Sequence, residues 1–399
     1  MTEANRNPVV LAFDTHPIQY RAPVFRELER QLPGAVRVIY ENDRSVRGYR
    51  DAGFGREISW DIPLLEGYDV TVLESKSDGK SVRSNWWGDP RVDRIIDACN
   101  PKAILLHQIN VRFSMAVYFA AVRRRIPLWF RAETQDRAFE RSKIKECIRG
   151  IIYRLIYRKV DLAFCVGEAN REHLLRFGIP GDKMRMARFG TPDPLAGLTS
   201  DEKIARRIAK RREMGFEDED YVVAFFGKLI PKKDPLLLQE AYSLLPAPLR
   251  ARTHLLYVGS GELDAELHRR NDDLQKSAGR EVSHFAGFVN QKAISDYYLA
   301  ADALVLPSRK MGETWGLVVN EALQAGCAAV VSDAVGCSLE FGTWERVRVI
   351  PVGDAAALAT SLESLSGFPR DFTWAAKSMN AYTIEAAATA LAAEIKTLA

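Results

Sequence analysis

Two glutamates eight residues apart, Glu313 and Glu321, form the pair in this sequence with the clearest chemical use. A predicted strand over 303–306 precedes them, and a predicted helix begins around Gly316. Glu313 therefore lies in the loop at the carboxyl end of the strand, and Glu321 lies about one and a half turns into the helix. Free backbone N–H groups at a helix start can bind phosphate, and carboxylates can accept hydrogen bonds from sugar hydroxyls. This segment predicts a site for a phosphorylated sugar derivative.

A second segment adds positive charge. FFGKLIPKKDPLLLQEAYSLL, at 225–245, is a predicted strand followed by Gly227, Lys228 and Lys233, and then by a helix that begins at Pro235. Two lysines five residues apart at the carboxyl end of a strand can converge on a diphosphate and stabilise it as it leaves, without a metal. The alternative for both segments is ordinary: solvated lysines, a helix-start acid and a surface glutamate.

Four motifs carry a family resemblance over residues 221–345: GKLIPKKD, YVGSGEL, HFAGFVNQKAISDYYLAADALVLPS and GETWGLVVNEALQAG. In order and spacing they resemble the signature of family 4 glycosyltransferases, a retaining family. The resemblance implies the α/β class and the GT-B fold, in which two Rossmann-like doubly wound domains face each other across a cleft. The sequence departs from the family pattern at Lys228, which replaces an arginine, and at Asp234, Ala328 and Cys337, which replace Gly, Pro and Gly.

The resemblance also implies roles. Lys228 and Lys233 would contact the donor diphosphate, Glu313 the transferred sugar and Glu321 the ribose. Further donor-binding residues implied by the match are Gly227, Gly259, Gly261, Gly287, Phe288, Thr314, Trp315, Gly316, Leu317 and Val318.

Two sets of short apolar runs, separated by segments of helix length, predict the two parallel sheets. The predicted strands are 9–13, 36–40, 70–73, 103–107, 128–131 and 162–166, then 221–226, 254–258, 282–285, 303–306, 328–332 and 347–350. We expect an acceptor-binding domain over 1–195, a linker over 196–219 and a donor-binding domain over 220–375. The helical segment 376–399 is expected to return to the first domain.

The first domain is expected to bind the acceptor at the carboxyl ends of its strands. DTHPIQYRAPVFREL, at 14–28, resembles a subgroup in which H-P-I-Q-Y opens the acceptor loop. Two later predicted strands also end in polar residues. The candidates are His16, Gln19, Tyr20, His107 and Arg131 for acceptor binding and Glu133 for the reaction centre. The alternative is that His16 and Pro17 only shape the entry to a helix.

Composition excludes several classes of protein. The chain has 399 residues, 47% hydrophobic and 27% charged, which is typical of a globular protein with two or three domains. Five cysteines without a C-x-x-C pair indicate neither a disulfide framework nor a zinc site. Glu74 stands where a phosphate loop preceding DGKS needs glycine, and H-E-x-x-H is absent. No leader pattern or apolar run of about 18 residues occurs, and the cysteines fit a reducing compartment, so we expect a cytoplasmic protein. We expect no metal ion, because metal-binding motifs are absent, and no cofactor, because the nucleotide sugar would be a substrate.

Charge is concentrated in one segment. The net charge is only +4, too small a surplus to indicate nucleic acid, yet 137–159 alone carries eight basic and two acidic residues, a net of +6. Ile144, Ile148, Ile151, Ile152 and Leu155 form a helical apolar stripe there. The pattern is compatible with contact to an anionic membrane surface, at the inner face of the plasma membrane. The alternative is a helix that packs its stripe on the sheet.

Together these features predict a metal-independent, retaining transferase that moves a sugar from a UDP- or GDP-sugar to a glycan or lipid-linked acceptor. Such a reaction belongs to bacterial-type synthesis of surface polysaccharide or glycolipid. Two alternatives stay open: a nucleotide-sugar 2-epimerase on the same fold, and a non-catalytic sugar-binding relative. Finding an epimerised donor in the absence of acceptor would favour the epimerase.

Overall fold

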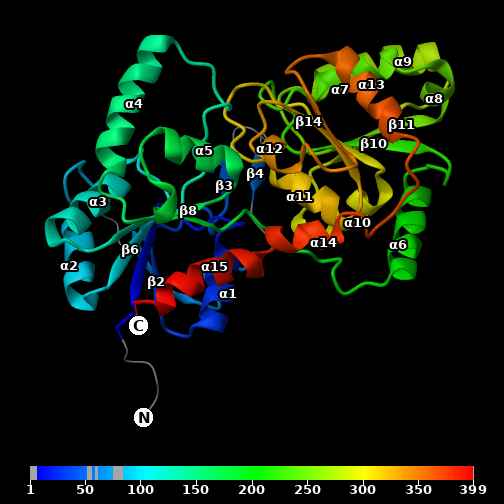
Figure 1. Cartoon of the computed structure of the whole chain (residues 1–399). Coiled ribbons are helices and arrows are strands. Elements are labelled where there is room, and N and C mark those ends of the chain that lie inside the picture. The colour runs from blue at the N-terminus through cyan, green and yellow to red at the C-terminus, as the bar shows by residue number, and fades with distance from the viewer. Residues whose placement is uncertain (1–6, 52–55, 59–61, 75–83, 399) are drawn as a thin grey trace.

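The computed structural model describes residues 7–51, 56–58, 62–74 and 84–398. Figure 1 shows two α/β domains side by side, the first coloured blue to green and the second green to orange, with the red C-terminal helices crossing back to the first. Each domain has its own parallel sheet with helices on both faces, which is the doubly wound arrangement predicted from the sequence.

The first sheet has seven strands in the order β5-β2-β1-β6-β7-β8-β9, and all the neighbouring pairs are parallel. Its strands are β1 (Val10–Asp14), β2 (Val36–Asn42), β5 (Asp69–Glu74), β6 (Ala103–Leu106), β7 (Leu128–Phe130), β8 (Leu162–Cys165) and β9 (Met184–Met186). The helices are α1 (Ala22–Gln31), α2 (Pro90–Cys99), α3 (Arg112–Arg124), α4 (Lys143–Tyr157) and α5 (Glu168–Arg176). All six strands predicted here exist; β9 and a short hairpin of β3 (Tyr49–Asp51) and β4 (Arg56–Ile58) were not predicted.

The second sheet has six strands in the order β12-β11-β10-β13-β14-β15, again parallel throughout. They are β10 (Tyr221–Phe226), β11 (Thr253–Val258), β12 (Ser283–Gly287), β13 (Ala303–Leu306), β14 (Ala328–Ser332) and β15 (Val347–Ile350). The helices are α7 (Leu236–Leu244), α8 (Ala247–Arg252), α9 (Asp264–Ala278), α10 (Gln291–Ala300), α11 (Leu317–Gln324), α12 (Ser338–Phe341) and α13 (Ala355–Leu365). All six predicted strands are confirmed, and β10, β13 and β14 are buried along their whole length.

The segment between the domains contains a helix that packs on the second domain. α6 (Ser200–Glu213) begins at a capping box formed by Thr199 and Glu202. It lies against α10. The Asp302 carboxylate forms ion pairs with Arg207, at 2.5 Å, and with the fully buried Arg211, at 2.6 Å. This part of 196–219 is therefore held to the second domain by buried ion pairs.

The last helix lies on the first domain. α14 (Ala376–Met379) and a 3₁₀ turn lead into α15 (Ile384–Lys396), which packs against α1. Ala388 and Leu391 share one apolar core with Val24 and Leu28. The chain therefore crosses between the domains twice. No helix in the described part of the chain is long and apolar enough to cross a bilayer.

Candidate functional site

Lys233 and Glu313 meet at the carboxyl ends of two neighbouring strands of the second sheet. Lys233 lies in the loop after β10 and Glu313 in the loop after β13, and Lys233 Nζ is 2.6 Å from Glu313 Oε2. The Ser308 hydroxyl donates to the same oxygen at 3.3 Å. Burial would raise the pKa of Glu313, but the charges of Lys233 and Lys232 outweigh burial and hold it below the usual value. Glu313 is therefore a buried, ionised carboxylate.

The two loops are tied to each other by more than this pair. Asp234 is in the left-handed region, at φ 51°, where glycine has no steric penalty. A left-handed backbone favours the glycine common in the family, and aspartate can replace it because Asn and Asp are the other residues that adopt this region. The Asp234 carboxylate accepts from Arg309 Nε at 2.7 Å, and Lys232 Nζ donates to the Gly312 carbonyl at 2.9 Å. These contacts hold the loops that carry Lys233 and Glu313 at a fixed separation.

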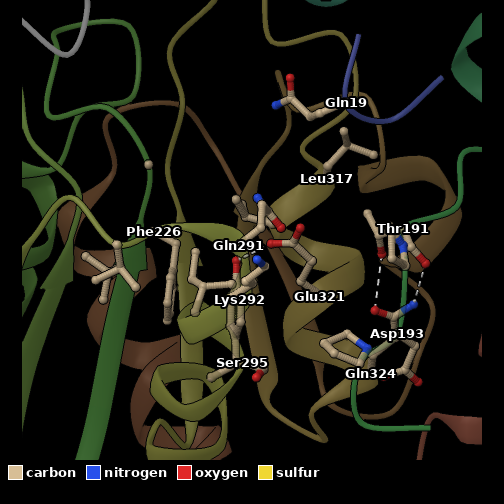
Figure 2. A pocket seen from close by; sticks show the side chains of 18 of the residues that line it. Gln19, Thr191, Asp193, Phe226, Gln291, Lys292, Ser295, Leu317, Glu321 and Gln324 are labelled. Atoms are coloured by element: carbon tan, nitrogen blue, oxygen red, sulfur yellow. Dashed lines mark hydrogen bonds between the residues drawn. The ribbon is translucent and has the colours of Figure 1, made fainter. Parts of the chain in front are cut away.

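A cavity of about 400 Å³ opens between the domains (Figure 2). Several predicted residues line it. They are Gly227, Gly259, Phe288, Leu317, Val318 and Glu321 from the donor set, and Gln19 and Tyr20 from the acceptor set. The sequence did not indicate the other polar or aromatic lining residues, among them Thr191, Asp193, Phe226, Gln291, Lys292, Ser295, Tyr298 and Gln324.

Glu321 projects from α11 into the middle of this lining (Figure 2). Tyr298 on α10 donates to Glu321 Oε2 at 2.6 Å, and the Tyr298 ring is stacked on Phe226 with centroids 3.8 Å apart. Burial raises the pKa of Glu321 to about 7, in spite of the Tyr298 hydrogen bond. Glu321 Oε2 accepts a hydrogen bond from the protein, and Glu321 Oε1 could accept one from a hydroxyl of a ligand.

The raised pKa of Glu321 predicts a pH-dependent stability. The folded chain holds the Glu321 proton up to about pH 7, whereas the unfolded chain releases it near 4.5. The stabilisation of the folded chain by the Glu321 proton is therefore full below about pH 4.5 and is lost as the pH rises through about 7. We expect Glu321→Gln to gain about 3 kcal/mol of unfolding free energy relative to wild type on going from pH 4.5 to pH 8, since each pKa unit corresponds to about 1.4 kcal/mol. Denaturant unfolding at both pH values measures this, and a difference that does not change with pH contradicts it.

Glycine turns form one wall of the cavity. Gly259 has φ 148°, and a Cβ there would lie 1.8 Å from the Gly227 carbonyl oxygen. Gly259 N donates to the Gly287 carbonyl at 2.8 Å, so three predicted glycines form one close-packed set of strand ends. A Cβ at Gly261 would lie 2.4 Å from the Leu229 carbonyl oxygen, but Gly261, like Gly287, does not line the cavity. No side chain fits at Gly259, whereas a Cβ at Gly227 would meet no atom within 4 Å, although its φ of 133° favours glycine. Both glycines line the cavity.

The residues Trp315 to Val318, which lead into α11 and begin it, divide into two roles. Gly316, at φ 102°, caps α11, and Leu317 and Val318 line the cavity. Trp315 is 4% exposed; its Nε1 donates to Asn320 Oδ1 at 2.9 Å, and its ring packs on Phe189 of the first domain, with centroids 5.4 Å apart. The Trp315 side chain therefore belongs to the interface between the domains and not to the cavity lining.

Glu133 of the first domain contacts the loop that carries Glu313. Its Oε1 accepts from Tyr20 at 2.7 Å and from Arg21 at 2.6 Å, and Arg21 also pairs with the buried Asp14 at 2.5 Å. Its Oε2 accepts from Thr314 Oγ1 at 3.4 Å. Since Thr314 follows Glu313 directly, the predicted carboxylates of the two domains lie at one junction.

The first domain also holds the backbone of the Glu313 loop. Gln135 Nε2 donates to the Glu313 carbonyl at 3.1 Å, and Gly312 N donates to the Ala138 carbonyl at 2.7 Å. On the far side of the cavity, Thr191 and Gln324 exchange hydrogen bonds at 3.2 Å (Figure 2). The position of Glu313 is therefore set by both domains together.

The remaining predicted residues lie outside the cavity lining. His16 bonds to Thr15 Oγ1 at 2.9 Å through Nδ1, and burial, followed by the nearby arginines, lowers its pKa to about 4. His107, 2% exposed, places Nδ1 3.1 Å from the Arg131 carbonyl, and Arg131 donates to the Ala187 carbonyl at 3.1 Å. A role for His107 and Arg131 in binding an acceptor stays a prediction, since both side chains are buried. Lys228, half-buried, follows Gly227 in the β10 loop.

Some of the lining could not be inferred from sequence. Tyr298 stands within one of the four motifs, but only the structure shows its hydrogen bond to Glu321. The segment 191–195 ends the predicted first domain, and no motif marks it as part of the cavity lining. Among the described residues, no group of three His, Cys, Asp or Glu side chains is arranged to hold a metal ion.

Family comparisons match both halves of the chain. Residues 206–370 match the model described as "Glycosyl transferases group 1", and residues 24–190 match "Glycosyltransferase Family 4". A glycosyltransferase of Methanocaldococcus jannaschii described as uncharacterized is 33% identical over 200 residues, which cover 49% of this chain and 48% of the relative. A D-inositol 3-phosphate glycosyltransferase of Thermomonospora curvata is 29% identical over 165 residues, 40% of this chain and 38% of the relative. The chain thus spans about half or less of the length of these curated relatives.

Solved structures support the fold over nearly the whole chain. The Anabaena protein HepE in complex with UDP aligns with a TM-score of 0.64 and 17% identity, covering 98% of this chain and 96% of that protein. A putative UDP-N-acetylglucosamine 2-epimerase from Listeria monocytogenes aligns with a TM-score of 0.59 and 15% identity, covering 98% and 96%. At such identities the likeness shows the fold alone, and it confirms the predicted GT-B architecture.

Proposed function

The chain belongs to the family 4 type of glycosyltransferases with the GT-B fold, and from this premise we propose that it transfers a sugar from a nucleotide diphosphate to an acceptor hydroxyl with retention of configuration. The proposed donor is a UDP- or GDP-sugar. The proposed acceptor is a glycan or a lipid-linked sugar, in the synthesis of a surface polysaccharide or glycolipid.

The observation that carries the proposal is the 2.6 Å pair of Lys233 and Glu313. Neither side chain lines the cavity, but Gly227 in the same loop as Lys233, and Leu317 and Glu321 shortly after Glu313, do. Lys233 supplies positive charge where the diphosphate departs, in a buried setting in which that charge is strongly felt. Glu313 accepts from hydroxyls of the transferred sugar, and Glu321 accepts from the ribose. In the reaction the bond from the anomeric carbon to the diphosphate breaks, the acceptor oxygen forms its bond at the same face of the sugar, and the proton of the acceptor hydroxyl passes to the departing diphosphate.

The first domain completes the proposed site. Glu133, held by Tyr20 and Arg21 next to Thr314, lies where the acceptor would meet the sugar. The two domains exclude water from the junction and orient the reactants, so positioning and electrostatics supply the catalysis. We propose that no metal takes part, because Lys228 and Lys233 can provide the charge that a divalent cation would otherwise supply.

Nucleotide binding tests this proposal most directly. We expect UDP or GDP, and the matching nucleotide sugar, to raise the melting temperature by several degrees at concentrations well above Kd, since a ligand bound only by the folded state stabilises it. Uridine and guanosine, which lack the diphosphate, are the matched controls and should have little effect. The measurement is a thermal-shift panel of nucleoside diphosphates and their sugars, with and without EDTA.

The outcomes separate the proposal from its alternatives. If no nucleoside diphosphate shifts the melting temperature, the chain is better described as a non-catalytic relative. If the identified donor is epimerised at C2 with no acceptor present, the epimerase alternative replaces transfer. A requirement for a divalent cation, seen as loss of turnover in EDTA, would refute metal independence alone.

A further inference from the structure

The outward face of α4 consists of aliphatic side chains that no other part of the described chain covers. These side chains recur at i, i+4, i+7, i+8 and i+11, and each is between 50% and 74% exposed. They are Ile144, Ile148, Ile151, Ile152 and Leu155, referred to below as the α4 face. A stripe of this kind on a helix of a globular domain ordinarily faces the core. The prediction that the stripe packs on the sheet is therefore wrong.

Aromatic residues on the opposite side hold α4 to the domain. Tyr157 is buried and its hydroxyl is 3.0 Å from His173 Nε2, while Tyr153 stacks on Tyr157 with centroids 5.2 Å apart. Gly150 is buried against Phe177, close enough that a Cβ at Gly150 would lie 3.2 Å from that ring. These contacts on the opposite side are enough to anchor the helix. The exposed side chains of the α4 face therefore have no packing role in the fold.

Positive charge flanks the α4 face on both sides. Five basic residues are exposed there, and none has an ion pair within the described residues: Lys143, Lys145, Arg154, Arg158 and Lys159. Of the other three basic residues in 137–159, Arg149 pairs with Asp136 at 2.8 Å and Arg137 lies 3.5 Å from Glu172, while Arg141 lies over the Phe139 ring at 4.9 Å. The charge left over is concentrated on the rim of an apolar surface.

We propose that the α4 face docks the protein on an anionic lipid membrane. A helix that lies in a membrane interface buries its apolar side chains at the acyl boundary and places lysine and arginine among the head groups. The α4 face runs from Ile144 to Leu155, which gives a contact about 18 Å long. A second copy of the chain is a poorer occupant, because it would bring two rims of like charge together.

The docking surface leads toward the site. Phe139 and Met311 are about half exposed and form an isolated antiparallel bridge that joins the loop before α4 to the loop before Glu313. Figure 1 shows α4 projecting from the first domain, with this loop running from its upper end toward the second domain. That a membrane-held acceptor reaches Glu313 by this route rests on the proposed function, whereas the docking itself does not.

Vesicle binding by the full chain tests the proposal without any substrate. We expect cosedimentation with vesicles of phosphatidylcholine and phosphatidylglycerol and much weaker binding to phosphatidylcholine alone. The triple variant Lys143→Gln, Lys145→Gln, Lys159→Gln should weaken binding about 10²-fold, because each lysine near an anionic surface contributes about fivefold in affinity. Ile148→Ser, Ile151→Ser and Leu155→Ser together should also abolish most of it. Both variants replace exposed side chains, so the melting temperature should stay within a degree or two of wild type.

Matched controls come from the rest of the surface. Leu244→Ser removes an exposed aliphatic side chain of α7, and Lys276→Gln, Lys377→Gln and Lys396→Gln together remove three exposed lysines. Both control variants should bind vesicles as wild type does. Three outcomes overturn the proposal: equal binding to neutral and anionic vesicles, wild-type binding by both α4 variants, or a lipid-independent dimer in sedimentation that the serine variant dissociates. Loss of nucleotide binding would leave the vesicle result unchanged, so the two proposals fail separately.

Discussion

Lys233→Ala is expected to lower turnover by about 10²- to 10³-fold at saturating donor, the range for removing one group that stabilises charge in the transition state. The ammonium lies 2.6 Å from the buried Glu313 and at the edge of the proposed diphosphate site. Its loss removes the charge that offsets the leaving diphosphate and leaves Glu313 without its closest cation. The measurement is kcat with saturating donor and acceptor, together with the melting temperature.

The conservative variant separates charge from structure. Lys233→Arg keeps the charge but replaces a compact ammonium with a planar fork, so we expect part of the turnover to return. Lys276→Ala, at an exposed position on α9, is the control and should match wild type. Near-normal turnover of a well-folded Lys233→Ala enzyme would rule out the proposed role.

Glu313→Gln is expected to reduce kcat by about 10²-fold or more with little change in the overall fold. The substitution preserves the size of the side chain but removes its negative charge, which Lys233 and Lys232 stabilise by lowering the pKa of Glu313. An amide accepts hydrogen bonds from sugar hydroxyls more weakly than a carboxylate does, because charge-assisted bonds are about twice as strong. Steady-state kinetics give the loss, and binding of the nucleotide without its sugar should change less than turnover.

Two comparisons sharpen this experiment. Glu345→Gln, at an exposed position after α12, should leave turnover unchanged. The double variant Lys233→Ala, Glu313→Gln should lose less than the product of the two single losses, because residues in direct contact act as a unit. Fully multiplicative losses would mean that Lys233 and Glu313 act independently, contrary to the arrangement proposed here.

The two sheets follow from sequence because of how buried parallel strands are built. Strands covered by helices on both faces read as continuous apolar runs, and YVVAFF of β10 and AAVVS of β14 are buried at every position. The elements that escaped prediction are three residues long. β9 is MRM, and the β3–β4 hairpin pairs Tyr49–Asp51 with Arg56–Ile58. Such segments carry too few apolar residues for a period to be seen.

The site was predictable only where its residues lie close together in the chain. The spacing of Glu313 and Glu321 and the position of Lys233 after a strand pointed to their chemistry. The bond from Tyr298 to Glu321 and the contact of Glu133 with Thr314 were not predictable, since they join segments 23 and 181 residues apart. The periodic pattern in 144–155 likewise predicted an apolar face on α4, but not whether that face packs on the domain or is exposed to solvent.

By itself, then, the sequence determined the two doubly wound domains, the strand ends that carry the charged residues and the concentration of positive charge in 137–159. Local patterns of burial and charge suffice for these because each depends on neighbours along the chain. Only the tertiary structure decided which side chains line the cavity, how both domains hold Glu313 and that the aliphatic face of α4 points outward. Those outcomes depend on the packing of distant segments, such as Tyr157 against His173, and no local period contains that information.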